Sequence, residues 1–168
     1  GGTKAMNACP NRVDPITTHI IPEEIAKIEI IKGPYTVRYG ATFGGIINMV
    51  TQKPNYLDKG FHGKASVGYE TNGNSFINML QLQYIQNKYD IVGNVGYRSF
   101  GNYNDGNDVE IPSSFLSTDY GLKLGYNFSD DKRLQIHWRQ SFGRDVLHAG
   151  LPMDTDYDNS SIISLDYK

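Results

Sequence analysis

Two loop segments carry side chains whose chemistry suits a soft metal ion. The run Met6-Asn7-Ala8-Cys9-Pro10 places a thioether and a thiol three residues apart, so both sulfur atoms can reach one ion such as Cu(I). A second loop, 145–154, carries His148 and Met153, which could complete such a site. The alternative is that Cys9 is a buried structural thiol and that the others are ordinary loop residues, because a free cysteine is usually a small core residue.

Other candidate chemistry is weaker. Acid-rich runs could bind calcium, but none has the ligand order of an EF-hand, so we interpret them as solvated loops: 102–108, 130–131 and 154–158. The glycines near Gly44 precede no helix and therefore do not form a phosphate loop. Neither His62 nor His137 has a serine or aspartate at catalytic spacing, and we predict that the chain is not an enzyme.

Composition limits the possible partners. The 168 residues carry a net charge of -2, which offers no basic surface for nucleic acid. Apolar runs are too short for a transmembrane helix, so any membrane crossing must use strands. The single cysteine excludes an internal disulfide. The abrupt beginning at Gly1 and the end at Lys168 within an expected strand suggest a fragment.

The first third of the chain predicts a compact β unit. Residues 1–20 are rich in turn formers and should form a loop, and Pro22–Lys27 should form a short helix, although an irregular turn fits nearly as well. An apolar strand then begins at Ile28 and breaks at Gly33-Pro34. Further strands are expected over Tyr35–Tyr39 and Ile46–Thr51.

From Gly60 onward the sequence alternates between apolar and polar residues in segments of about ten. We expect six strands, at 60–70, 75–84, 89–98, 119–128, 133–142 and from 163 onward. A soluble antiparallel sheet with one wet face would show the same period. The segment length and the aromatic residues at both ends of the apolar face favour a membrane β-barrel. Short turns, at 86–88 and 129–132, alternate with long loops at 100–117 and 143–160, as in outer-membrane barrels.

The polar face of these strands predicts a wide, filled barrel. It carries many charged residues, too many for a small eight-stranded barrel: His62, Lys64, Glu70, Asp90, Arg98, Asp119, Lys123, Arg133, His137, Arg139 and Asp166. A domain that plugs the lumen of a larger barrel would supply partners for them. Six strands cannot close such a barrel, because lipid does not tolerate an open sheet edge.

The stretch IEIIKGPYTVRYGATFGGIINMVTQKP, residues 28–54, resembles the end of the plug domain of TonB-dependent outer-membrane receptors. The resemblance implies a mainly β chain, with the C-terminal part of a plug at 1–54 and the first strands of a transmembrane barrel at 55–168. It also implies an outer-membrane location and three partners: membrane lipid, a small extracellular ligand, and the periplasmic energy-coupling protein TonB, whose contact box is not in this sequence. The role would be energy-coupled import of a scarce ligand, such as a metal or a metal chelate.

The run around Cys9 further resembles a Cys-Pro-Asn/Ala-Arg-Met-Asp-Pro loop of copper-receptor plugs, in which the cysteine and the methionine are ligands. Here Cys9 matches, but Val13 occupies the methionine position, so that Met6 would have to substitute. The resemblance thus implies copper as one candidate for the transported ligand, with Cys9, Met6, His148 and Met153 as its metal-binding residues, and no cofactor is expected. Two other functions remain open: a small outer-membrane barrel with an enzymatic or adhesive role, and a soluble β-sheet domain that binds carbohydrate.

Overall fold

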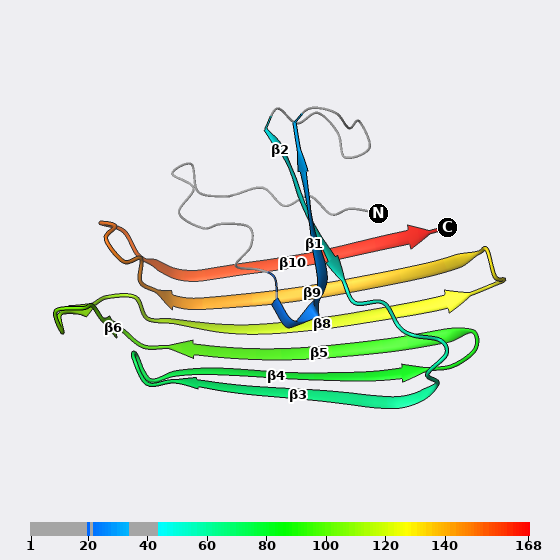
Figure 1. Ribbon diagram of the computed structural model, residues 1–168, viewed down its shortest axis with the longest axis horizontal. Coiled ribbons are helices and arrows are strands. Elements are labelled where there is room, and N and C mark those ends of the chain that lie inside the picture. Colours follow the sequence, from blue (N-terminus) through cyan, green and yellow to red (C-terminus); the bar gives the residue numbers. More distant parts are fainter. Residues whose placement is uncertain (1–19, 21, 34–43) are drawn as a thin grey trace.

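The computed structural model describes residue 20 and residues 22–33 and 44–168. The chain begins there with a 3₁₀-helix, Pro22–Glu24, followed by strand β1 (Ile25–Lys32). Strand β2 (Gly45–Thr51) pairs with β1 in an antiparallel two-stranded sheet. Of the predicted loop over residues 1–20 only residue 20 is described, and the predicted strand Tyr35–Tyr39 lies outside the described residues. Figure 1 shows the β1–β2 sheet crossing the direction of the longer strands.

The remaining long strands form one six-stranded antiparallel sheet in the order β10-β9-β8-β5-β4-β3. Their bounds are β3 (Gly60–Glu70), β4 (Ser75–Ile85), β5 (Tyr89–Phe100), β8 (Phe115–Asn127), β9 (Arg133–Val146) and β10 (Thr155–Tyr167). A small hairpin of β6 (Tyr103–Asn104) and β7 (Glu110–Ile111) lies in the connection between β5 and β8. The predicted mainly β fold with six antiparallel strands is confirmed.

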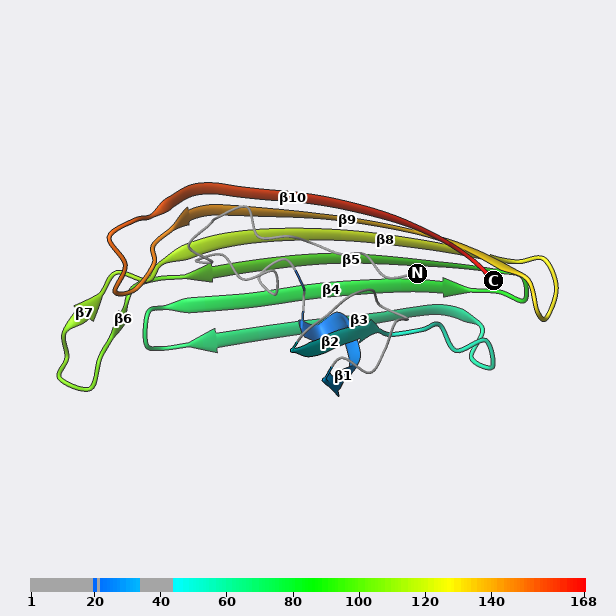
Figure 2. The ribbon, with the colours of Figure 1, turned by 90° about the horizontal axis from the view of Figure 1, so that it is seen from above.

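The sheet is curved, and the β1–β2 sheet lies on its concave side (Figure 2). Side chains alternate along each strand between this concave face and the convex face. On β8, Asp119 and Lys123 point inward and are 1% and 7% exposed, whereas Tyr120 and Leu122 point outward and are 39% and 38% exposed. The predicted division into a charged inner face and an apolar outer face is therefore confirmed for β8 and for its neighbours.

Connections at the two ends of the sheet differ in length, as predicted. The turns β4–β5 and β8–β9 lie at one end, at 86–88 and 128–132. The β6–β7 hairpin and the loop 147–154 lie at the other end, together with the short turn 71–74. In the part of the chain that the structure describes, no helix has the length and hydropathy needed to cross a membrane.

Aromatic pairs border the outer face near both ends. Tyr84 and Tyr89 have ring centroids 6.1 Å apart beside the β4–β5 turn, and Tyr126 and Phe128 are 5.0 Å apart beside the β8–β9 turn. At the opposite end the pairs are Tyr69–Phe76 and Tyr120–Phe142. Such rows at both edges of an apolar band are typical of strands that cross a membrane.

Four predicted boundaries were wrong. The helix expected over Pro22–Lys27 ends at Glu24, and the strand expected from Ile28 begins at Ile25, because Ile25 pairs with Thr51 across a β-bulge. The last strand begins at Thr155 and not near Ile163, which shortens the loop predicted over 143–160. Strand β8 likewise begins before residue 119, at Phe115. Cross-strand hydrogen bonds extend β8 and β10 beyond the residues whose apolar alternation predicted them.

Met79 interrupts the alternation of apolar and polar residues along β4, because it is an apolar side chain on the inner face. It is 4% exposed and lies opposite Gly96 on β5. A glycine has no side chain, so the thioether has room there, and Met79 fills the gap as an adaptable side chain.

Candidate functional site: a polar seam between hairpin and sheet

Buried polar groups join the N-terminal part of the chain to the concave face of the sheet. Three contacts make this junction, which we call the seam: Glu24 with Asn94 and Arg139, Lys123 with the end of β2, and Tyr56 with Asp90 and Arg133. Each contact joins residues that are at least 34 positions apart in sequence. The seam therefore fixes how residues 22–56 sit against the sheet.

Glu24 provides the central contact. Its carboxylate is 3% exposed, accepts a hydrogen bond of 2.7 Å from Asn94 Nδ2 and forms an ion pair with Arg139. The 3₁₀-helix aims the side chain at the sheet, and the Glu24 carbonyl oxygen accepts a 2.9 Å bond from Gln52 N. A Cβ atom at Gly121 would lie 3.2 Å from Glu24 Oε1, so glycine there permits the close approach. A buried carboxylate with two such partners is electrostatically compensated.

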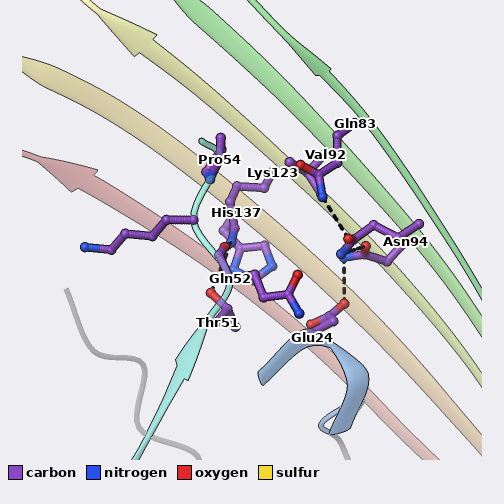
Figure 3. Close-up of a pocket in the computed structure, with 11 residues that line it drawn as sticks. Glu24, Thr51, Gln52, Pro54, Gln83, Val92, Asn94, Lys123 and His137 are labelled. Atoms are coloured by element: carbon purple, nitrogen blue, oxygen red, sulfur yellow. Dashed lines mark hydrogen bonds between the residues drawn. The ribbon is translucent and has the colours of Figure 1, made fainter. Parts of the chain in front are cut away.

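Lys123 holds the end of β2. Its ammonium group donates to Thr51 Oγ1 at 3.0 Å and to the Gln52 carbonyl oxygen at 3.1 Å. Beside it lies a small cavity of about 20 Å³, bordered by Glu24, Asn94 and His137 (Figure 3). That volume has room for about one water molecule and not for a larger ligand. The cavity is therefore a feature of the packing of the seam and not a substrate pocket.

Tyr56 anchors the linker that leads from β2 to β3, the first strand of the six-stranded sheet. Its hydroxyl donates to Asp90 Oδ1 and accepts a hydrogen bond from Arg133 Nη1. Arg133 Nη2 also donates to Asp90 Oδ1 at 2.7 Å, and the guanidinium carbon lies 5.5 Å from the centroid of the Tyr56 ring. Burial and the hydrogen bond to Asp90 raise the pKa of Tyr56, so the phenol stays protonated and remains a donor at neutral pH.

A substitution at Gly125 tests this anchor. A Cβ atom there would lie 2.0 Å from Arg133 Nη2 and 2.6 Å from Asp90 Oδ1. We expect Gly125→Ala to displace the guanidinium from the buried carboxylate and to cost about 2–4 kcal/mol of stability.

Samples are heated to increasing temperatures and loaded on a denaturing gel without boiling, where the folded protein migrates differently from the unfolded protein. The measured quantity is the temperature at which the folded band disappears. Gly93→Ala on β5 is the matched control, because a Cβ atom at Gly93 meets nothing within 4 Å. Equal transition temperatures for the two variants would show that the anchor does not stabilise the fold.

A further buried ion pair lies on the same face outside the seam. Arg98 Nη2 and Asp119 Oδ2 are 3.1 Å apart, and the Ser117 hydroxyl donates to the same carboxylate oxygen at 3.0 Å. The sequence predicted that these inward charges need partners, and partners are present for both residues.

Comparison with known proteins finds similar chains among the solved structures. No protein-family model and no curated protein matches the chain. Among solved structures, the copper transporter OprC superposes with a TM-score of 0.88 and 25% sequence identity, over 96% of this chain and 25% of that chain.

The chain is similar in fold to a copper transporter. It spans about a quarter of the length of OprC. Because the match covers nearly the whole chain, the similarity to OprC includes the β1–β2 sheet as well as the six-stranded sheet. OprC is a transporter and not an enzyme, which agrees with the prediction from sequence.

The structure describes two of the four predicted metal ligands. Cys9 and Met6 lie outside the described residues. His148 and Met153 both lie in the β9–β10 loop, where His148 Nε2 is 3.1 Å from Thr155 Oγ1 and Met153 is 42% exposed. Within residues 22–33 and 44–168, no three histidine, cysteine or acidic side chains are grouped to hold a metal ion. The four-residue set therefore stays a prediction.

Hydrogen bonds explain one aspartate of the acid-rich run at residues 102–108. Asp105 Oδ1 accepts hydrogen bonds from Asn107 N at 2.8 Å and Val109 N at 3.0 Å, which closes the β6–β7 turn. This agrees with the interpretation of residues 102–108 as a loop, whereas the loop predicted over 154–158 was wrong, because residues 155–158 belong to β10. The seam residues Glu24, Asn94 and Tyr56 were not singled out from sequence, because only their long-range contacts distinguish them from other polar residues.

Proposed function

We propose that this chain is part of an energy-coupled outer-membrane receptor that imports a ligand through a plugged barrel. Residues 1–54 belong to the plug and residues 55–168 to the barrel wall. The observation that carries the proposal is the similarity to OprC over 96% of the chain. The resemblance of residues 28–54 to receptor plugs supports it independently.

The two faces of the sheet support the placement in a membrane. Outward side chains form an apolar band between aromatic rows, whereas the inward charges of the seam are buried against the N-terminal part of the chain. Strands β3 and β10 are the two edge strands of the six-stranded sheet, and each pairs with one neighbouring strand in it. A membrane barrel must be closed, so further strands have to pair with both edges.

The seam gives the plug its blocking position. Ion pairs and hydrogen bonds at Glu24, Lys123 and Tyr56 fasten it to the inner wall. Import requires these contacts to break or to shift, and a periplasmic partner of the TonB type would supply the work. The plug thereby changes between a blocking and a permissive state, and external ligand binding biases that equilibrium.

Copper is the ligand that the residues favour, although a metal chelate would suit the same class of receptor. Cys9 and Met6 supply soft sulfur donors from the plug, and His148 and Met153 supply a nitrogen and a sulfur donor from the β9–β10 loop. That loop lies at the end of the sheet with the long connections, which faces outward in outer-membrane barrels.

Copper accumulation in cells tests the proposal. Cells that express the complete receptor should take up more labelled copper at limiting concentration than cells in which its gene is deleted. The difference should vanish when the proton-motive force is collapsed, because energy coupling is required. Uptake that is equal in both strains would exclude copper as the ligand, and uptake that survives the collapse would exclude energy coupling.

A further inference from the structure

The outward face of the six long strands is almost free of charge. Outward positions are the odd residues of β3, β5 and β10 and the even residues of β4, β8 and β9. Among these described positions Arg144 is the only charged residue. It lies near the end of β9, on the long-loop side of the aromatic pair Tyr120–Phe142. A single cation in an otherwise uncharged lipid-facing surface is costly unless an anionic group binds it.

The guanidinium of Arg144 is held in a fixed position. Nη1 donates to Asn159 Oδ1 at 2.5 Å and to the Gly143 carbonyl oxygen at 2.6 Å, and the guanidinium carbon lies 5.5 Å from the Phe142 ring centroid. Both hydrogen bonds use Nη1. Within the described part of the chain no acidic side chain forms an ion pair with Arg144. The edge formed by Nε and Nη2 is therefore available, and this edge can bind two oxygens of one oxyanion side by side.

The surroundings indicate which oxyanion fits. Leu116 on β8 and Tyr157 on β10 are the cross-strand neighbours of Arg144, and Tyr157 is 69% exposed. Strand β9 has partners on both sides, so strands that add to the sheet at β10 leave Arg144 uncovered. A lipid with a phosphate group and an acyl chain fits these surroundings, because the phosphate can bind the cation while the acyl chain packs against the apolar and aromatic side chains. A free phosphate ion would make no favourable contact with Leu116 or Phe142.

We propose that Arg144 binds the phosphate group of a membrane lipid at the outer rim of the barrel. The inference rests on the proposed function, which places this end of the sheet at the outer surface of the membrane. The stem of Arg144 would lie along the apolar band while the guanidinium reaches the level of the lipid headgroups.

Native mass spectrometry of the complete receptor in detergent micelles tests the site, with lipopolysaccharide as the probe. Arg144→Gln should weaken lipid binding by at least about tenfold, because a charge-assisted hydrogen-bond pair is lost. Arg144→Lys should give an intermediate affinity, since it keeps the charge but not the planar fork. Lys132→Gln is the matched control: it removes one positive charge from an exposed residue of the turn at the other end.

The arms of the experiment separate the possible sources of phosphate. Lipopolysaccharide stripped of its phosphates should bind the wild-type receptor as weakly as the intact lipid binds Arg144→Gln. Excess inorganic phosphate should leave the lipid bound, and displacement by the free ion would overturn the assignment to a lipid. Equal lipid binding by Arg144→Gln and wild type, with both inserted as folded barrels, would refute this inference alone. A wild-type receptor that fails to insert into bilayers would refute the proposed function as well.

Discussion

Replacing Arg139 with glutamine is expected to open a leak through the receptor. The change removes the cation that compensates Glu24, which is 3% exposed, and leaves a buried carboxylate whose remaining side-chain partner among the described residues is Asn94. Breaking one side of a buried ion pair costs about 3–5 kcal/mol. If the N-terminal part of the chain is the plug that we propose, that cost is enough to shift it towards states in which it no longer blocks the lumen. The measurement is single-channel conductance of the complete receptor in planar bilayers, where wild type should stay closed.

Two further variants make the result specific. Adding Glu24→Gln to Arg139→Gln should restore much of the closure, because the double variant no longer buries an unpaired charge. Lys27→Gln removes the cation of an exposed pair, Lys27 Nζ to Glu29 Oε1 at 2.5 Å, and should leave the receptor closed, since exposed pairs contribute about 1 kcal/mol or less. If Arg139→Gln conducts no more than Lys27→Gln, the seam does not hold the plug.

The second large effect concerns the metal. Cys9→Ser is expected to lower the affinity of the complete receptor for Cu(I) by more than about 100-fold, because a hydroxyl is a poor ligand for a soft ion. A competition titration against a Cu(I) chelator of known affinity measures the change. Asn7→Ser is the control, since it alters the same loop without removing a sulfur atom.

The β9–β10 loop should contribute less to the metal site than the Cys9 thiol does. His148→Ala and Met153→Leu should each weaken binding by roughly tenfold if these side chains complete the site. An unchanged affinity in Cys9→Ser would leave the thiol a structural residue and would remove the basis for copper as the ligand.

Much of the barrel wall could be predicted because a strand with one apolar face imposes a period of two on its sequence. Leu122 and Leu124 alternate with Lys123 on β8, and the structure places them on opposite faces. The first half of β10 was missed for the same reason. Residues 155–161 lie outside the apolar band, so nothing in their hydropathy marks them as a strand, and only pairing with β9 defines them.

The seam could not be predicted, because its partners are far apart along the chain. Glu24 and Arg139 are separated by 115 positions, and each is an ordinary charged residue in its local sequence. The sequence did predict that inward charges need partners within the lumen, which follows from the cost of burying an unpaired charge. Which residues meet depends on how residues 22–56 sit against the six-stranded sheet, and that is a tertiary property.

The orientation of the two faces is the claim on which the receptor role depends. Nitroxide labels at Leu122→Cys and Ser164→Cys in the complete receptor, reconstituted in bilayers, measure it directly through collisions with oxygen and with a water-soluble nickel chelate. Leu122 points outward and Ser164 inward. We therefore expect the label at residue 122 to collide mainly with lipid-dissolved oxygen and the label at residue 164 not to do so. Lipid exposure at residue 164 and protein burial at residue 122 would contradict it.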